Sequence, residues 1–531
     1  MREKKQHILF SIESALLFSV LFVFILGVKA QQPPAEPKII EMRNAGELVK
    51  RPTTEAQVFL NDVVFYHEGA FMYCDSAYLY EEANRFEAFS NVIINQGDTI
   101  FVYGDYLDYE GDIKLAKLRN NVKMEDNQAT LYTDSLNYDR MNNLGYYFDG
   151  GMLVDEKNEL TSFWGQYNPE NYEALFSDSV KLVNKQYTIF ADTLKYNTSS
   201  KIVDILGPSS IVSDSGYIHT TRGWYNTITD DSQLLDRSTV FSSNGDKTLT
   251  GDTIYYNRTN GLGTVHGNMH LQDTAMKVIL QGNYGYYNEK TEFALATDSA
   301  FAIEYSQKDS LFLHGDTLTM LTDSIYREVK AFHNVRFFRN DVQGVCDSME
   351  YLSKDSILYM YIEPILWHEN NQIIGEEMNI YLNDSTIDKV HVKNYAYSIQ
   401  DRQKDDQYNQ LKGRNMNAHF KDGELRYILV EGDAESLYYL EEDDGTIIGL
   451  NKTQSAYLSM DIEKNELQKL KLWSSTTAEM NPLSILKPED KKLKDFIWYD
   501  NVRPLNKMDI FRRPKKDPTE KRVTPRQFIR D

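Results

Sequence analysis

The sequence predicts an all-β protein of stacked repeats, each about 30 residues long, and three observations support this fold class. A five-residue phrase, Asp-Ser/Thr-aliphatic-x-Tyr, returns at a nearly fixed interval, as at Asp134–Tyr138, Asp192–Tyr196 and Asp252–Tyr256. The 36 Tyr and 25 Phe residues favour strands, and long runs of strong helix formers are rare after residue 56. Apolar and polar side chains alternate within each phrase, which is the periodicity of a half-buried strand.

The first 55 residues have the features of an export signal and a linker. Basic residues near the N-terminus precede an apolar run from Ala15 to Val28, and small residues end at Ala30. We expect residues 1–30 to be a signal peptide that is cleaved after Ala30. An uncleaved membrane anchor is the alternative, because counted from Ile8 the run reaches a spanning length, although Glu13 interrupts it. Residues 31–55, rich in Gln and Pro at their start, are expected to form a linker.

The repeats follow from residue 56. Their first positions are 75, 105, 134, 163, 192, 222, 252, 283, 316, 347, 377 and 414, of which 163, 222, 283, 377 and 414 begin degenerate copies. About 15 residues after each Asp phrase comes a second strand, such as Asn121–Met124 or Asn334–Phe338, with turn residues between the two. Each repeat is therefore predicted to be a strand pair in an antiparallel sheet, stacked in a sandwich, jelly roll or solenoid.

The spacing of the repeats changes along the chain. We expect a regular repeat domain over residues 56–351, a looser continuation over 352–475, and a charged C-terminal tail over 476–531. The stretch 510–531 has eight Lys or Arg residues against three acidic ones. It is interpreted either as a disordered tail or as a docking segment for an acidic partner, a phosphate-bearing lipid or a cell-wall polymer.

Strand periodicity predicts the buried face of each repeat. Positions two and four after the Asp are apolar, as at Leu194 and Tyr196, and in the degenerate copy that begins at 222 position two is Trp224. Positions one and three, such as Thr193 and Lys195, are polar and expected to face water. Position two before the Asp is aromatic and is expected on the same buried face: Tyr73, Tyr103, Tyr132 and Phe190. Stacking would then align apolar columns inside the molecule.

The two cysteines are expected to be free. Cys74 and Cys346 each stand directly before a repeat Asp, where other copies carry small residues such as Gly104 and Gly251. They lie nine repeats apart, which places them far beyond disulfide distance in a stack.

Signatures of catalysis are weak. There is no nucleophile elbow, Walker-type loop or dinucleotide fingerprint, and the sequence at His368-Glu369 lacks the second histidine of a metalloprotease helix. His266 and His270 are expected on one face of a strand, where exposed or hydrogen-bonded histidines are commoner than metal ligands. We therefore predict no enzyme activity, no metal and no cofactor. The net charge of −22 argues against a nucleic-acid partner.

The recurrence of the Asp has two possible explanations. An Asp followed by Ser or Thr and an aliphatic residue resembles an O-glycosylation sequon that some bacteria use. Its coincidence with the repeat period favours a structural cause, such as hydrogen bonding beside a turn.

The combination of an export signal with tandem strand pairs resembles the OstA-like family, the periplasmic jellyroll modules of lipopolysaccharide transport. The motifs are a small residue before Asp-x-aliphatic-x-Tyr and an Asn/Gly-x-Val strand, most clearly from Ala56 to Tyr196. The resemblance implies an elongated jellyroll or β-taco of two stacked antiparallel sheets, with acyl chains held inside and modules joined through edge strands.

Our functional prediction is a non-enzymatic periplasmic protein that binds and bridges lipid for lipopolysaccharide transport to the outer membrane. The expected partners are lipopolysaccharide or another acylated lipid, other jellyroll transport proteins and an outer-membrane complex. The predicted groove residues are Leu107, Tyr109, Leu136, Tyr138, Leu194, Tyr196, Ile254 and Tyr256. The alternative is a structural or adhesive surface β-repeat protein in which the same residues form a closed core.

Overall fold

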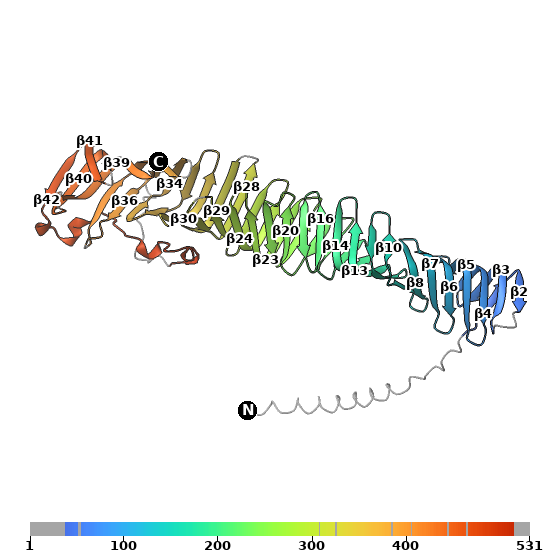
Figure 1. The fold of residues 1–531 in the computed structure, drawn as a ribbon. Coiled ribbons are helices and arrows are strands. Elements are labelled where there is room, and N and C mark those ends of the chain that lie inside the picture. Colours follow the sequence, from blue (N-terminus) through green and yellow to red (C-terminus); the bar gives the residue numbers. More distant parts are fainter. Residues whose placement is uncertain are drawn as a thin grey trace, which may run out of the picture. The chain divides into compact units, whose positions relative to one another are not determined.

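The computed structural model describes residues 38–50, 55–306, 308–323, 326–383, 386–404, 406–442, 445–463 and 466–514. Within these residues the protein is all-β, with antiparallel strands and four short 3-10 helices, so the predicted fold class is confirmed (Figure 1). The chain divides into two compact units, unit 1 (residues 1–149) and unit 2 (residues 150–531). The predicted signal peptide lies outside the described residues. Among the described residues, no helix has both the length and the apolar character needed to cross a membrane.

Unit 1 is a meander of long hairpins in which β3 to β9 pair in sequence order and β1 and β2 both pair with β3. Its strands are β1 (Glu41–Asn44), β2 (Glu47–Lys50), β3 (Gln57–His67), β4 (Ala70–Tyr80), β5 (Arg85–Gln96), β6 (Ile100–Glu110), β7 (Leu115–Glu125), β8 (Thr130–Asp139) and β9 (Leu144–Tyr147).

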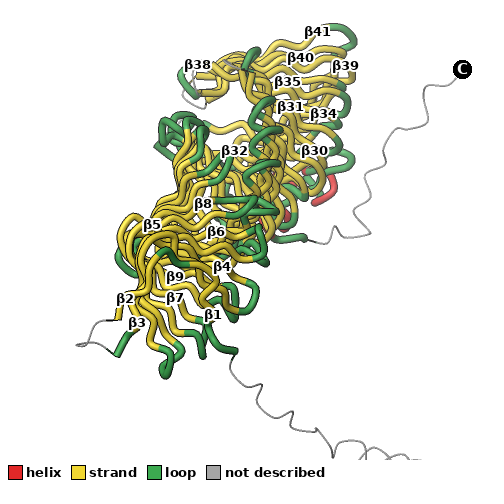
Figure 2. Tube along the Cα trace, turned by 90° about the vertical axis from the view of Figure 1, so that its right-hand side faces the viewer, coloured by secondary structure: helices red, strands yellow, loops and turns green. Residues whose placement is uncertain are grey.

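Each long strand of unit 1 bends at its middle and so belongs to two half-sheets. The bend on alternate strands is a bulge of two residues with positive φ, for example Asn120 and Asn121 at 63° and 51°. We call the part that follows the repeat Asp half-sheet A and the part that precedes it half-sheet B. Their inner faces pack together, as shown by Phe65 of half-sheet B and Phe86 of half-sheet A, whose ring centroids are 4.3 Å apart. Figure 2 shows the strands of successive repeats lying one behind another within each unit.

The bend explains why Asp and Asn recur together in the sequence. The Asn of the bulge donates a side-chain hydrogen bond to the repeat Asp of the neighbouring strand, as between Asn121 and Asp105 at 2.6 Å. The same bond joins Asn91 to Asp75, Asn268 to Asp252, and Asn334 to Asp316, at 2.6–2.8 Å. The repeat Asp thus fixes the corner between the half-sheets, in agreement with the structural cause favoured from the sequence.

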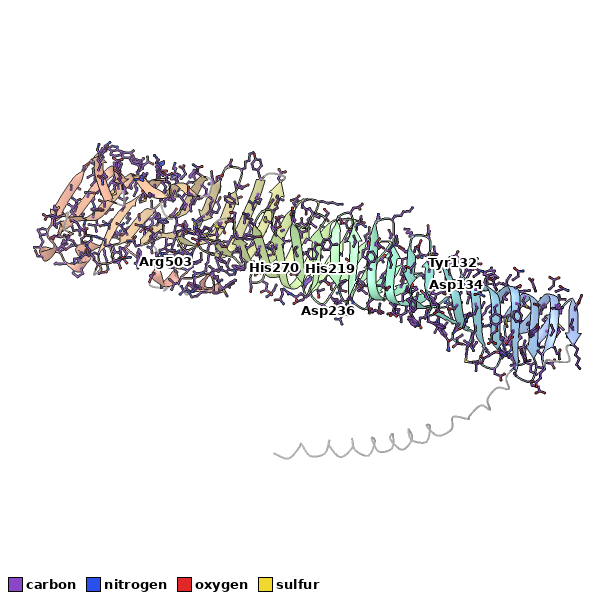
Figure 3. The ribbon with its side chains drawn as sticks, in the orientation of Figure 1. Tyr132, Asp134, His219, Asp236, His270 and Arg503 are labelled. Carbon is purple, nitrogen blue, oxygen red and sulfur yellow. The ribbon has the colours of Figure 1, made fainter. Side chains whose placement is uncertain are left out.

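One predicted column faces the wrong way. Position two before the Asp lies on the outer face, where Tyr73 is 38%, Tyr132 42% and Phe190 47% exposed (Figure 3). The corner interrupts the alternation of faces, because the Asp is skipped in the ladder and the residue directly before it points inward instead. That inward position is the small-residue column of Cys74 and Gly251. A Cβ on Gly251 would lie 2.1 Å from Cγ1 of Val265, so the crowded corner requires a small side chain.

Unit 2 has the same two half-sheets. In its first part, however, most strands are short and belong to one half-sheet only. β14 pairs with β15 through half-sheet A and with β16 through half-sheet B, and β23 joins both half-sheets again. The strands are β10 (Gly151–Val154), β11 (Glu159–Ser162), β12 (Trp164–Asn168), β13 (Glu173–Val183), β14 (Tyr187–Asn197), β15 (Ile202–Ile205), β16 (Ser209–Ser213), β17 (Gly216–Thr220), β18 (Gly223–Asn226), β19 (Asp231–Leu234), β20 (Ser238–Ser242), β21 (Lys247–Gly251), β22 (Thr253–Asn257), β23 (Leu262–Asp273) and β24 (Val278–Asn288).

The rest of unit 2 repeats this pattern, and one buried core between the half-sheets runs from Leu234 to Met460. Its strands are β25 (Phe293–Thr297), β26 (Phe301–Glu304), β27 (Leu311–His314), β28 (Thr317–Asp323), β29 (Tyr326–Phe338), β30 (Val342–Leu352), β31 (Ile357–Tyr361), β32 (Ile365–His368), β33 (Asn371–Ile374), β34 (Glu377–Asn383), β35 (Thr386–Lys393), β36 (Ala396–Asp401), β37 (Tyr408–Gly413), β38 (Asn415–Lys421), β39 (Glu424–Glu441), β40 (Ile447–Glu463), β41 (Glu466–Trp473) and β42 (Thr477–Asn481).

After β42 the chain turns back and covers the outer face of half-sheet B. We call residues 483–514 the strap; it contains η1 (Leu483–Ile485), η2 (Pro488–Lys491), η3 (Asp500–Val502) and η4 (Asp509–Phe511). Its apolar side chains form a second core with the outward side chains of the last repeats, including Trp367, Tyr397 and Tyr439. Of the stretch 510–531, for which a disordered tail or a docking segment was expected, residues 510–514 belong to the strap, and residues 515–531 lie outside the described part.

Buried glutamines hold the strap at successive repeats. The Gln372 amide donates to the carbonyl of Ile497 at 2.9 Å and accepts the backbone N–H of Tyr499 at 2.7 Å. The same paired contact joins Gln410 to the backbone of Lys491 and Leu493, and Gln343 accepts from the guanidinium of Arg503 (Figure 3). At the end of the strap, Arg513 pairs with the repeat carboxylate Asp316 at 2.5 Å. The sheet side chains thus bind the strap mainly through its backbone.

Candidate functional site

The predicted groove residues lie on the inner faces of the half-sheets. Leu107, Tyr109, Leu136 and Tyr138 are buried in unit 1, and Leu194, Tyr196 and Ile254 are buried in unit 2, whereas Tyr256 is half-buried. The structure brings Ile254 and Tyr256 together at one cavity and places the other six in closely packed interior. One degenerate copy was read out of phase, because Trp224, expected inside, faces outward and Tyr225 occupies the buried position.

The tyrosine column lies along the open edge, opposite the corner at which the half-sheets meet. In unit 1 the hydroxyls of Tyr109 and Tyr138 are hydrogen-bonded to polar side chains there. In unit 2 the column is Tyr167, Tyr196, Tyr225, Tyr256 and Tyr287. Of these, Tyr225 donates to Asp230 at 2.6 Å and Tyr256 donates to Glu289 at 2.8 Å. The repeated tyrosine thus supplies an apolar ring to the interior and a polar group to its rim.

A polar network closes the open edge of unit 1. Arg140 donates to the Tyr109 hydroxyl at 2.7 Å, to Gln96 at 2.9 Å and to the backbone carbonyl of His67. His67 Nε2 donates to the carbonyl of Lys38, so its Nδ1 accepts the proton of the Tyr109 hydroxyl at 2.7 Å. Arg140 is buried in this network, which closes the open edge of unit 1 at this position.

A second network closes the first repeats of unit 2. Asp155, whose side chain has no exposed surface, accepts hydrogen bonds from Lys201 at 2.8 Å and from Tyr196. Burial raises the pKa of the Asp155 carboxyl, but the hydrogen bonds from Lys201, Tyr196 and the backbone outweigh it and lower the pKa overall. Asn158 donates to the same Tyr196 hydroxyl at 2.9 Å. The interior is therefore sealed next to Tyr196.

Beyond this seal the half-sheets enclose an apolar cavity of about 160 Å³ between β14 and β24. Its walls include Ile211, Ile218, Val240, Leu249, Ile254 and Leu271. At one end the rings of Tyr187 and Tyr225 meet edge to face across the two half-sheets, with centroids 4.8 Å apart and an interplanar angle of 72°. Cavities of similar size in other proteins hold a benzene-sized apolar molecule. This cavity can therefore hold a segment of one hydrocarbon chain as it stands.

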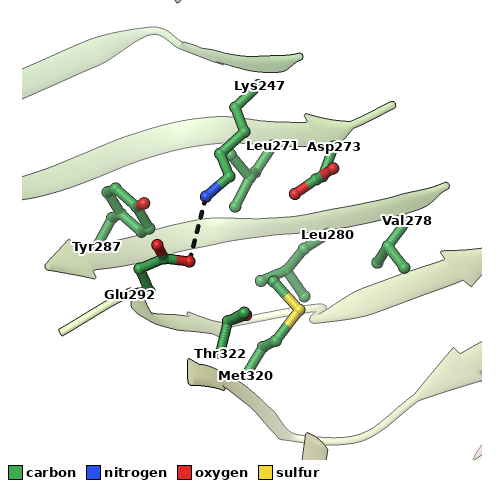
Figure 4. Close-up of a pocket in the computed structure, with 9 residues that line it drawn as sticks. All are labelled: Lys247, Leu271, Asp273, Val278, Leu280, Tyr287, Glu292, Met320 and Thr322. Carbon is green, nitrogen blue, oxygen red and sulfur yellow. Dashed lines mark hydrogen bonds and ion pairs between the residues drawn. The ribbon is translucent and has the colours of Figure 1, made fainter. Parts of the chain in front are cut away.

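A smaller cavity of about 20 Å³ adjoins the first one and shares Lys247, Leu271 and Tyr287 with it (Figure 4). Lys247 of half-sheet B reaches across the open edge to Glu292 of half-sheet A, with Nζ and Oε2 3.5 Å apart. A second weak bridge crosses the edge where Arg258 donates to Gln186 at 3.3 Å. The edge is thus held by longer contacts here than at Asp155.

The histidines that the sequence singled out belong to no metal-binding group in the described part of the chain. No group of three or more His, Cys, Asp or Glu residues there could hold a metal ion. The bulge at Gly267 separates His266, which lies between Tyr255 and Tyr284, from His270, which is hydrogen-bonded to Gln281 at 2.7 Å (Figure 3). His368 ends strand β32 and is not on a helix.

Both cysteines are free, as predicted, and the structure buries both. Burial raises the pKa of the Cys74 thiol to about 12 and that of Cys346 further still. Neither thiol is therefore ionised at neutral pH.

Fold and site together define a β-repeat protein with an apolar interior and a polar rim. Residues 37–192 match the family model of the OstA-like protein, so the OstA-like assignment is confirmed for this segment. Among solved structures the chain is similar to LptH, described as the LptA homologous periplasmic component of the conserved lipopolysaccharide transport device from Pseudomonas aeruginosa. The identity is 13%, the match covers 20% of this chain and 74% of that one, and the TM-score is 0.18. No curated protein matches the chain.

Proposed function

We propose that this protein is a non-enzymatic lipid-binding and bridging component of lipopolysaccharide transport in the periplasm. The OstA-like segment over residues 37–192 supports the transport class. The observation that carries the lipid proposal is the apolar cavity between the half-sheets, because two of the predicted groove residues, Ile254 and Tyr256, line it. Each methylene removed from water contributes about 0.8 kcal/mol, so even a short enclosed chain segment is bound usefully.

The repeats that the Arg140 and Asp155 networks close have a different role in this proposal. Leu107, Tyr109, Leu136, Tyr138, Leu194 and Tyr196 would contact acyl chains only if the Arg140 and Asp155 networks opened. Until then these repeats act as a spacer that carries the cavity. The outermost strands support joining to other jellyroll proteins, since β1 and β2 pair only with β3 among the described strands and are mostly exposed.

Photo-crosslinking in cells tests the proposal. A photoreactive amino acid at Ile254, Leu194 or Leu136 should form adducts with acylated lipid, first at Ile254, where the cavity is present without any opening. Tyr255 is the matched control, because it neighbours Ile254 on β22 but faces outward. Adducts at Tyr255 equal to those at Ile254, or none at any inward position, would contradict lipid carriage inside the half-sheets.

The second candidate is a structural surface protein with a closed core. The Arg140 network favours it for unit 1, since it closes the edge with buried hydrogen bonds. Under this alternative no inward position forms lipid adducts and the protein is accessible to antibodies on intact cells.

A further inference from the structure

The cavity contains one buried polar group that the fold does not use. Tyr187 lines the cavity and is 5% exposed, and its hydroxyl makes no hydrogen bond of ordinary length and angle with a residue that the structure describes. Tyr225, the ring beside it, interacts weakly with this hydroxyl but gives its own proton to Asp230. Its neighbours in the cavity wall, Tyr225 and Tyr256, donate to Asp230 and Glu289 instead. A buried hydroxyl without a partner costs free energy, so its retention next to an apolar cavity points to a partner supplied by a ligand.

The protonation state of this hydroxyl decides what it can bind. Burial raises the pKa of Tyr187, and Asp230 raises it further, so the phenol stays protonated at neutral pH and can donate a hydrogen bond. The complementary ligand group is therefore an acceptor, such as a carbonyl oxygen.

The charges around the cavity decide whether that acceptor is neutral or anionic. Lys247 and Arg258 are the basic groups of the lining, and both are already engaged, with Glu292 and Gln186. The acidic groups are Glu289 in the lining, Glu292 and Asp273 in the adjoining cavity, and Asp230 beside Tyr225. Acidic groups thus outnumber basic ones, and an ionised head group would meet net repulsion at the rim.

We propose that this cavity binds a single acyl chain joined through an uncharged ester or amide, with Tyr187 donating to the acyl carbonyl. This inference rests on the proposed function and narrows it, because it selects the linked acyl chain over the free fatty-acid anion. The volume of about 160 Å³ agrees with one chain segment and not with several chains side by side.

The test uses the full-length mature protein with two probes of equal chain length, monolauroyl glycerol and laurate, at a pH where laurate is ionised. Each probe displaces a neutral fluorescent hydrophobe, below its critical micelle concentration. Wild-type protein should bind monolauroyl glycerol more tightly. Tyr187→Phe should weaken that binding by about fivefold, which is the worth of one hydrogen bond to an uncharged group, and should leave laurate binding unchanged. Glu289→Gln should strengthen laurate binding and leave monolauroyl glycerol unchanged.

The controls separate the two proposals. Tyr255→Phe, an outward tyrosine on the neighbouring strand, should change neither affinity. Tyr187→Phe should melt at or above the wild-type temperature, since no internal hydrogen bond is lost. If wild-type protein binds neither probe, the lipid-binding function itself is refuted. If monolauroyl glycerol binds wild type and Tyr187→Phe equally, or laurate binds more tightly than the ester, only the present inference is refuted.

Discussion

Gln372→Leu should detach the strap from the last repeats. Gln372 has no exposed surface, and its amide bonds the carbonyl of Ile497, the N–H of Tyr499 and the indole of Trp367. Leucine has nearly the same volume but offers no polar atom, so up to three buried groups lose their partner. Each unsatisfied group costs about 1–3 kcal/mol, and partial access to water as the strap loosens reduces the sum to about 2–5 kcal/mol.

Two measurements report this change. Trypsin should cut the strap at Lys491 and Lys492 faster than in wild type, because cleavage requires local opening. Fluorescence of Trp367, which is buried under the strap, and of Trp498, which the strap packs against the same core, should respond at lower urea concentration. The matched control is Gln454→Leu, the same substitution at an exposed position of β40, with an expected change under about 0.5 kcal/mol. Equal proteolysis and equal unfolding in wild type and Gln372→Leu would refute the role assigned to the glutamine clamps.

Three further predictions follow from single contacts. The pKa of Asp155 is lowered by its hydrogen bonds despite burial, so its ionised form stabilises the fold above the ordinary carboxyl pKa near 4, and this contribution is lost as the pH falls through the lowered folded value. Asp155→Asn should therefore unfold more easily than wild type at neutral pH and lose that difference in strong acid, as chemical denaturation across pH will measure. Asn121→Ala removes an exposed corner bond to Asp105 and should cost about 0.5–1.5 kcal/mol, while Asn142→Ala, in an exposed turn, should cost less. Cys74 and Cys346 should resist maleimide in the native protein and react fully in denaturant; rapid native labelling would contradict their burial.

Much of the fold could be predicted because the repeat imposes one local pattern many times. The Asp phrase and the Asn strand were recognised separately, and the structure joins them through bonds such as Asn91 to Asp75. The inward positions two and four after the Asp were correct at Leu107 and Tyr109 because alternation holds within one half of a strand. Alternation failed at Tyr73 and Phe190, since the corner bulge resets which side of the chain faces inward.

The sequence predicted which of these side chains face the interior, but not which of them line a cavity. Equivalent positions such as Tyr138 and Tyr256 have the same sequence context, yet Tyr138 is sealed in unit 1 and Tyr256 lines a cavity. The difference depends on rim partners, several of which come from distant strands: Gln96 and Tyr138 share Asn143, Arg140 binds Tyr109, and Asp155 binds Tyr196. The unpaired hydroxyl of Tyr187 was not foreseen, because a missing hydrogen bond has no sequence signal.

The sequence alone determined the repeat length, the strand pairs and the separation that keeps the two cysteines unpaired, because these depend on side-chain order within one repeat and on its recurrence along the chain. Only the tertiary structure decided where the half-sheets seal and where they leave a cavity, and that residues 483–514 return to cover half-sheet B. The physical reason is that closure and covering are contacts between segments far apart in the chain. Gln372 and Tyr499, for example, are separated by 127 positions before a single hydrogen bond joins them.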